Sequence, residues 1–159
     1  MNVRTLVILR HAKAEHPVRV ADVDRPLTDR GHDDAAQAGR WLEQRGYRPS
    51  LVLCSPARRA RQTWLGLSVP CDSVQYDGRL YGAGALELLD VVAEVDDEVG
   101  VLLLVGHNPG LGDLSALLDP ARGEAGLRTS GIAVHAVDES WSRWTPGMAP
   151  VADSHTARA

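Results

Sequence analysis

Short runs of aliphatic and β-branched residues alternate along this chain with longer stretches that have helical periodicity. The apolar runs lie at residues 4–9, 51–54, 74–76, 101–105 and 132–137, and each is short enough to be one buried strand. Strands that alternate with helices build sheets in which most strands are parallel. The pattern therefore predicts a three-layer α/β/α sandwich with a largely parallel central sheet.

Four helices are expected to connect these strands. The best defined spans residues 29–45, with Thr28 as its N-cap and Gly46 as its C-cap. A second should open at Ser55-Pro56, where serine caps the helix and proline takes its first position. The other two are expected over residues 85–96 and from Asn108-Pro109 to about Leu118.

The length of 159 residues suits one domain, which we expect to span residues 1–147. Residues 148–159 are expected to form a loose tail, and residues 141–144 a final edge strand. The polar segment 12–27 should be a loop, and the segment 119–129 is too short to form a lid subdomain. The prediction is therefore an open site.

Charge and composition exclude several classes of protein. The formal net charge is −4, and no aromatic residues are interleaved with basic ones, so nucleic acid is not an expected partner. No Gly-x-Gly-x-x-Gly follows the first strand, which argues against a dinucleotide-binding fold. The apolar run at residues 5–9 is too short for a signal peptide or a membrane span, so a cytoplasmic location without membrane association is expected.

Cationic side chains follow three of the predicted strands. Arg10 and His11 come after the first strand, Arg59 follows the second, and His107 follows the strand at residues 101–105. Ligands of α/β sheets bind beyond the carboxyl ends of the strands, so these groups should converge there. Two guanidiniums and two imidazoles with little acidic balance are what a phosphoryl group requires.

The patterns around these residues resemble the motifs of the histidine phosphatase superfamily, which includes the cofactor-dependent phosphoglycerate mutases. The three motifs, in chain order, are Leu9-Arg10-His11-Ala12, Ser55-Pro56-x-x-Arg59-Ala60-x-x-Thr63 and Val105-Gly106-His107-Asn108. The resemblance spans roughly residues 3 to 137 and implies a phosphoglycerate mutase-like fold. Ala12 replaces the glycine of the family's first motif, which is a mild departure.

Further segments are similar to the small phosphohistidine phosphatases of the SixA type. They are Asp24-Arg25-Pro26-Leu27-Thr28-x-x-Gly31, Leu80-Tyr81 and Thr129-Ser130-Gly131-Ile132. The resemblance implies that His11 is the nucleophile and forms a covalent phosphohistidine, which water then hydrolyses. It also implies that Arg10, Arg59 and His107 hold the transferred group, with Arg25 as a further phosphate contact.

The general acid is the least defined part of the predicted site. Larger members of the family carry a glutamate after the region equivalent to residue 80, where this chain has Tyr81-Gly82-Ala83-Gly84. The candidates that remain are Asp22, Asp24 and Glu87. A phosphoramidate leaves with less help than an alkoxide when its nitrogen is already protonated, so a missing glutamate is compatible with phosphohistidine as the substrate.

The predicted function is a phosphatase that needs neither a metal nor a cofactor, because the remaining histidines show no ligand spacing. Its partner would be a phosphorylated protein, with a histidine-containing phosphotransfer domain as one candidate, or a small phosphorylated substrate. Three alternatives stay open. They are a small-molecule phosphomonoesterase, a non-catalytic phosphate-binding module, and a metal-dependent phosphohydrolase that uses His107 and loop acids.

Overall fold

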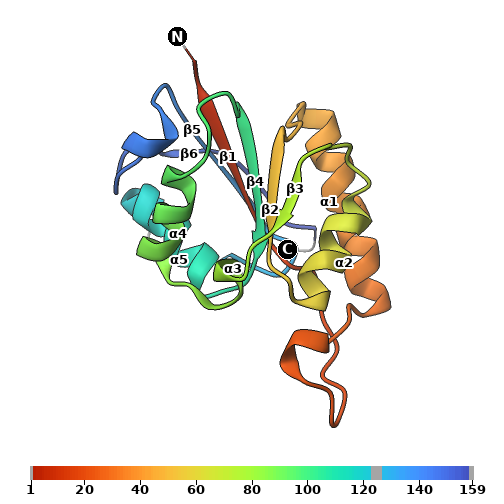
Figure 1. Cartoon of the computed structure of the whole chain (residues 1–159). Coiled ribbons are helices and arrows are strands. Elements are labelled where there is room, and N and C mark those ends of the chain that lie inside the picture. The colour runs from red at the N-terminus through yellow and green to blue at the C-terminus, as the bar shows by residue number, and fades with distance from the viewer. Residues whose placement is uncertain (1, 123–126, 158–159) are drawn as a thin grey trace.

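The computed structural model describes residues 2–122 and 127–157. Six strands form one sheet in the order β3-β2-β4-β1-β5-β6, and helices cover both of its faces (Figure 1). The strands are β1 (Arg4–Arg10), β2 (Leu51–Cys54), β3 (Val74–Tyr76), β4 (Val101–Gly106), β5 (Ile132–Val137) and β6 (Val151–His155). The helices are α1 (Asp29–Arg45), α2 (Arg58–Leu67), α3 (Arg79–Gly82), α4 (Ala85–Ala93) and α5 (Gly110–Leu118).

The central part of the sheet is parallel. β4 lies between β1 and β2 and pairs in parallel with both, and β3 extends the parallel part beyond β2. β5 runs antiparallel to β1, and β6 runs antiparallel to β5, so β6 has the direction of β1 again. The predicted three-layer sandwich with a largely parallel sheet is confirmed, and the carboxyl ends of β1, β2 and β4 meet at one edge.

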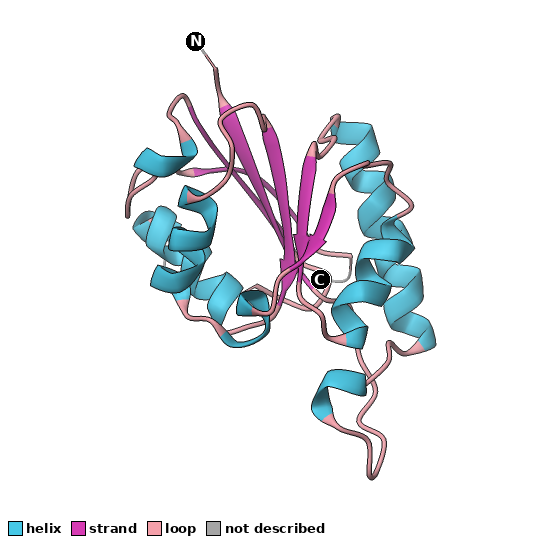
Figure 2. Cartoon of the chain, in the orientation of Figure 1, coloured by secondary structure: helices cyan, strands magenta, loops and turns pink. Residues whose placement is uncertain are grey.

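Alternate residues of the strands fill two separate cores, because successive side chains of a strand point to opposite faces. Leu6 and Ile8 of β1 pack in the cluster that includes Leu88 of α4 and Leu111 of α5. Val7 and Leu9 pack instead with α1 and α2, and the cluster there includes the two tryptophans of these helices, Trp41 and Trp64. Figure 2 shows the resulting layers, with the magenta strands between two sets of cyan helices.

Helix α1 has the predicted bounds because both of its caps form. The Thr28 hydroxyl accepts a hydrogen bond from Gly31 N at 2.9 Å, and Gly46 takes the left-handed conformation at φ 74°. The predicted start of α2 at Ser55-Pro56 is wrong, since the helix begins at Arg58. Ser55 Oγ instead contacts His107 Nε2 and accepts a hydrogen bond from Ala57 N, and the chain bends at residues 56–57 so that Ala57 is the N-cap.

The prediction of an edge strand at residues 141–144 is also wrong. This segment forms a 3-10 helix, η3 (Trp141–Arg143), and the Trp141 and Trp144 rings stack with their centroids 4.9 Å apart. Residues three apart lie on the same side of a 3-10 turn but on opposite faces of a strand, so burial of both indoles selects the turn. Trp141 Nε1 also donates to Val99 O at 2.7 Å.

The loose tail predicted at residues 148–159 is contradicted for residues 151–155, which form the edge strand β6. Backbone pairing with β5 holds the strand, and the His155 ring stacks on Trp41 at 5.0 Å between centroids. The mixed polar sequence Val-Ala-Asp-Ser-His gives no alternation that predicts a strand. Residues 158–159, and residues 123–126 of the short segment at 119–129, lie outside the described part of the chain.

Residues 15–25, which we call the arm, project from the sheet edge where β1, β2 and β4 end (Figure 1). A bridge between Ala14 and Leu27 and a hydrogen bond from Glu15 N to Pro26 O at 2.8 Å close its base. The arm contains one short 3-10 helix, η1 (Asp22–Asp24), which lies against α2. The chain therefore carries a braced projection beside the predicted site.

Gly39 permits the close approach of α1 to α2, which carries Arg59. A Cβ atom at residue 39 would overlap the carbonyl oxygen of Leu67. We expect Gly39→Ala to lower the free energy of unfolding by about 1–3 kcal/mol in urea denaturation. The matched control is Gly78→Ala, whose added Cβ would meet nothing within 4 Å. Equal stability of the two variants would contradict this packing argument.

Candidate active site

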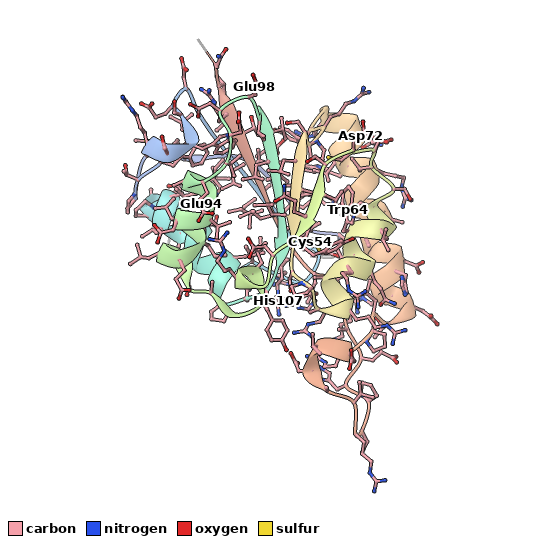
Figure 3. The ribbon with its side chains drawn as sticks, in the orientation of Figure 1. Cys54, Trp64, Asp72, Glu94, Glu98 and His107 are labelled. Atoms are coloured by element: carbon pink, nitrogen blue, oxygen red, sulfur yellow. The ribbon has the colours of Figure 1, made fainter. Side chains whose placement is uncertain are left out.

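The two predicted imidazoles leave adjacent strands of the sheet at the same edge. Arg10, the last residue of β1, pairs with Gly106, the last residue of β4, so His11 and His107 follow directly after paired positions. His11 N donates to Gly106 O at 2.9 Å, which continues the ladder by one step. The two rings lie 5.1 Å apart between centroids, and Figure 3 shows His107 at the lower edge of the sheet, below Cys54.

The hydrogen bond of His11 fixes its tautomer. Its Nδ1 lies 2.7 Å from the carbonyl oxygen of Ala12. Because a carbonyl oxygen only accepts hydrogen bonds, Nδ1 must carry the proton. In the neutral ring the lone pair then resides on Nε2, which is the nitrogen available for attack on an electrophile.

Both site arginines have a nitrogen that is hydrogen-bonded within the protein and another that is not. Arg10 Nη1 donates to Leu127 O at 3.2 Å, and Arg59 Nη1 donates to Asp22 O at 2.7 Å. The Nε atoms of both guanidiniums are buried and have no hydrogen-bond partner among the described residues. Each guanidinium therefore has a buried N–H that no described protein atom accepts.

The other polar groups of the site follow the same pattern. His107 Nε2 is hydrogen-bonded to Ser55 Oγ at 2.7 Å, while its Nδ1 is buried without a partner in the described part of the chain. Ser130 Oγ is equally buried and unpartnered within residues 2–122 and 127–157. A buried unpaired polar group costs about 1–3 kcal/mol, so the two Nε donors, His107 Nδ1 and Ser130 Oγ together suit a ligand with several oxygens.

Burial keeps both imidazoles neutral near pH 7. Desolvation, together with smaller electrostatic contributions from His107, Arg59 and Arg10, lowers the pKa of His11 to about 3, although the hydrogen bond to Ala12 raises it. Desolvation and the Arg59 charge lower the pKa of His107 to about 4. A neutral His11 has the free lone pair that a nucleophile requires.

Asp22 of η1 joins the arm to the site. Its carboxylate accepts hydrogen bonds from Tyr81 Oη at 2.5 Å, from Arg25 Nη1 at 2.9 Å and from Arg59 Nη2 at 3.0 Å. The Tyr81 ring in turn meets the His107 ring edge-on at 5.5 Å between centroids. The hydrogen bonds from Tyr81, Arg25 and Arg59 hold the pKa of Asp22 far below its ordinary value, so this carboxyl is ionised at neutral pH.

The structure treats the other predicted residues unequally. Arg25 and Arg59 each form an ion pair with the Asp22 carboxylate, so Arg25 is linked to the site through Asp22. Asp24 and Glu87 are exposed, and neither carboxyl has a hydrogen bond to a site residue in the described ranges. Only one of the three candidate acids, Asp22, is therefore part of the cluster, and it is in the ionised form.

Sequence reasoning missed several supporting residues. Thr63 Oγ1 accepts a hydrogen bond from Ala12 N at 2.9 Å and donates to Arg59 O at 2.7 Å, so it links the loop after His11 to α2. Ser130 N donates to both Arg10 O and His11 O at 3.1 Å. Ser55 and Thr63 were visible as members of the second motif. Nothing in the sequence signalled the contact of Tyr81 with Asp22.

The described residues contain no group of three or more His, Cys, Asp or Glu that could hold a metal ion. Among the same residues, no helix has the length and apolar character that crossing a bilayer requires. Two neutral imidazoles and two guanidiniums at one edge of a parallel sheet are groups that can bind the oxygens of a phosphoryl group.

The comparisons with known proteins identify the family. A family model for the histidine phosphatase superfamily (branch 1) matches residues 6–81. Phosphohistidine phosphatase SixA of Escherichia coli is 32% identical over 139 residues, covering 84% of this chain and 85% of the relative. An uncharacterised protein of Mycobacterium tuberculosis is 38% identical over 161 residues, covering 94% of this chain and all of the relative.

Solved structures agree with this relationship. A structure assigned to phosphohistidine phosphatase SixA from Nakamurella multipartitia has a TM-score of 0.85 and 33% identity, covering 100% of this chain and 99% of that chain. A protein histidine phosphatase SixA in complex with tungstate has a TM-score of 0.77 and 26% identity, covering 96% and 97%. This chain belongs to the histidine phosphatase superfamily, and it is a phosphatase.

The neutrality of the two site imidazoles can be measured directly in the free protein. Because burial lowers both pKa values, His11 and His107 should stay unprotonated from pH 7.5 down to about pH 5, where an ordinary imidazole with a pKa of about 6.5 is mostly charged. NMR titration of the ring Cε1–H signals would follow this, with exposed imidazoles in the same sample as the reference. Midpoints near 6.5 for His11 or His107 would contradict the desolvation argument.

Proposed function

We propose that this phosphatase removes the phosphoryl group from phosphohistidine in a protein, through a phosphohistidine formed on its own His11. His11 Nε2 attacks phosphorus, and the bond from phosphorus to the imidazole nitrogen of the substrate breaks. Water then cleaves the new P–N bond, which releases inorganic phosphate and restores His11. The tautomer set by Ala12 O and the low pKa of His11 support this role.

Arg10, Arg59 and His107 are proposed to bind the oxygens of the transferred group. Each has a buried nitrogen without a protein partner within the described residues, namely Nε of the two arginines and Nδ1 of the histidine. Nδ1 of neutral His107 is a donor in the tautomer in which Nε2 accepts from the Ser55 hydroxyl. Donors that are fixed before the substrate arrives need no reorganisation as charge develops on the oxygens. Arg25 adds a positive charge beside Arg59, because it forms an ion pair with the same carboxylate, Asp22.

The three side chains that donate hydrogen bonds to the Asp22 carboxylate are the observation that favours phosphohistidine over a phosphate ester. An alkoxide leaving group needs a proton in the transition state. Asp22 binds Tyr81, Arg25 and Arg59 as a carboxylate and has no proton to give at neutral pH. A phosphohistidine whose leaving imidazole already carries a proton does not need that donor. The names of the SixA relatives support the same substrate class.

Trapping the intermediate tests the role of His11. With ³²P-labelled phosphoramidate as the substrate and a quench in alkaline detergent, the wild-type chain should retain label that is stable in alkali and lost in acid. His11→Ala should retain none, because it has no nucleophile. His32→Ala, which removes an exposed imidazole of α1, should label like the wild type. Label on the His11→Ala protein would reject the assignment.

The leaving group tests the absence of a general acid. For aryl phosphates whose phenols differ in pKa, kcat/KM should rise several-fold for each unit by which the phenol pKa falls, since charge on the departing oxygen stays unneutralised. Asp22→Asn should leave that slope unchanged, whatever it does to the absolute rate. A flat dependence in the wild type that becomes steep in Asp22→Asn would show that Asp22 supplies a proton.

A further inference from the structure

The exposed apolar residues of the chain are concentrated beside the site. Eight large apolar side chains are exposed within the described residues, and four of them are Val18, Val20, Val23 and Tyr81. The first three lie on the arm, and Tyr81 binds Asp22 of the arm. Val18 is 87% exposed, which is the highest value of the eight. Isolated surface valines need no explanation, but three on one projection next to a site do.

The arm is held in place although its surface is exposed. Arg25 Nε donates to Glu15 O at 2.8 Å across the base, and Leu27 N donates to the Gln62 side chain at 2.8 Å. Asp22 holds the η1 segment of the arm in place by accepting hydrogen bonds from Arg59 and Tyr81. All residues from 15 to 24 are nevertheless exposed. The valines are thus presented on a braced support, which lowers the entropy cost of binding through them.

The position of the arm decides what kind of molecule would cover it. A phosphoryl group at the Nε donors of Arg10 and Arg59 is held at the sheet edge, whereas the arm projects away from that edge (Figure 1). A small phosphorylated compound fills the site without reaching the tip of the arm. A phosphohistidine side chain instead places the surface of its own protein over the mouth of the site, beside the arm.

We propose that the arm is a docking surface for the phosphorylated protein substrate, with Val18 and Val20 packing against an apolar patch next to its phosphohistidine. This inference rests on the proposed function, because it takes that function's substrate as the occupant. The valines would contribute binding energy remote from the reacting atoms, so they would act on KM for the protein substrate and leave the chemistry unchanged.

The test compares two substrates of the same chemistry and different size. The probes are a histidine-containing phosphotransfer domain phosphorylated on its histidine, and free phosphohistidine. For the double variant Val18→Ser/Val20→Ser, kcat/KM should fall about tenfold on the phosphorylated domain, through KM. On free phosphohistidine it should change less than twofold. Val18→Ile/Val20→Ile should retain activity on both probes.

The matched control is Val3→Ser, since Val3 is 58% exposed at the opposite end of β1. It should behave like the wild type on both substrates. An unchanged double variant, or an equal loss on both substrates, would overturn the docking role alone. A wild-type chain that hydrolyses aryl phosphates but neither phosphohistidine probe would overturn the proposed function and the docking role together. A wild-type dimer that the double variant abolishes, seen by sedimentation, would assign the arm to a second copy of the chain instead.

Discussion

The parallel pairing of β1 with β4 is the constraint from which the rest of the site follows. Because Arg10 is in register with Gly106, the residues that follow them, His11 and His107, lie side by side at the end of the sheet. Paired strands lie about 4.8 Å apart, and the imidazole centroids of His11 and His107 lie 5.1 Å apart. The spacing of the two rings is thus close to the spacing of the backbones that carry them. β2 continues the arrangement, since Ser55 N donates to Val105 O and its hydroxyl reaches His107.

A hydrogen bond at one end of each side chain fixes the orientation of the group. Backbone carbonyls hold Nη1 of both arginines and Nδ1 of His11, and a serine hydroxyl holds His107. The opposite end of each group is then oriented without flexibility. In the described chain, several buried donors have no protein partner, and a buried donor that nothing pairs costs about 1–3 kcal/mol. The two apolar cores on either side of the sheet can offset such a cost, and an anion would remove it.

The parts of this structure that sequence patterns predicted are those that local chemistry determines. The apolar runs defined five strands, the Thr28 and Gly46 caps defined α1, and the strand ends located both arginines and both histidines. The errors arise where tertiary contacts decide. β6 has no strand pattern and exists through pairing with β5. The helix η3 depends on the burial of two indoles. The Ser55 hydroxyl contacts His107, and α2 begins three residues later, at Arg58. Local sequence contains none of these contacts.

The role of Asp22 was out of reach of sequence reasoning for a deeper reason. The sequence left it as one of three candidate acids, but the protonation state of a carboxyl depends on what surrounds it. A carboxylate that holds two guanidiniums and a phenol is stabilised in its charged form by each of them. A general acid needs its pKa raised toward the working pH, whereas the same contacts that orient Arg59 lower the pKa of Asp22. One residue cannot serve both purposes at neutral pH, and in the proposed function the leaving group of the substrate brings its own proton.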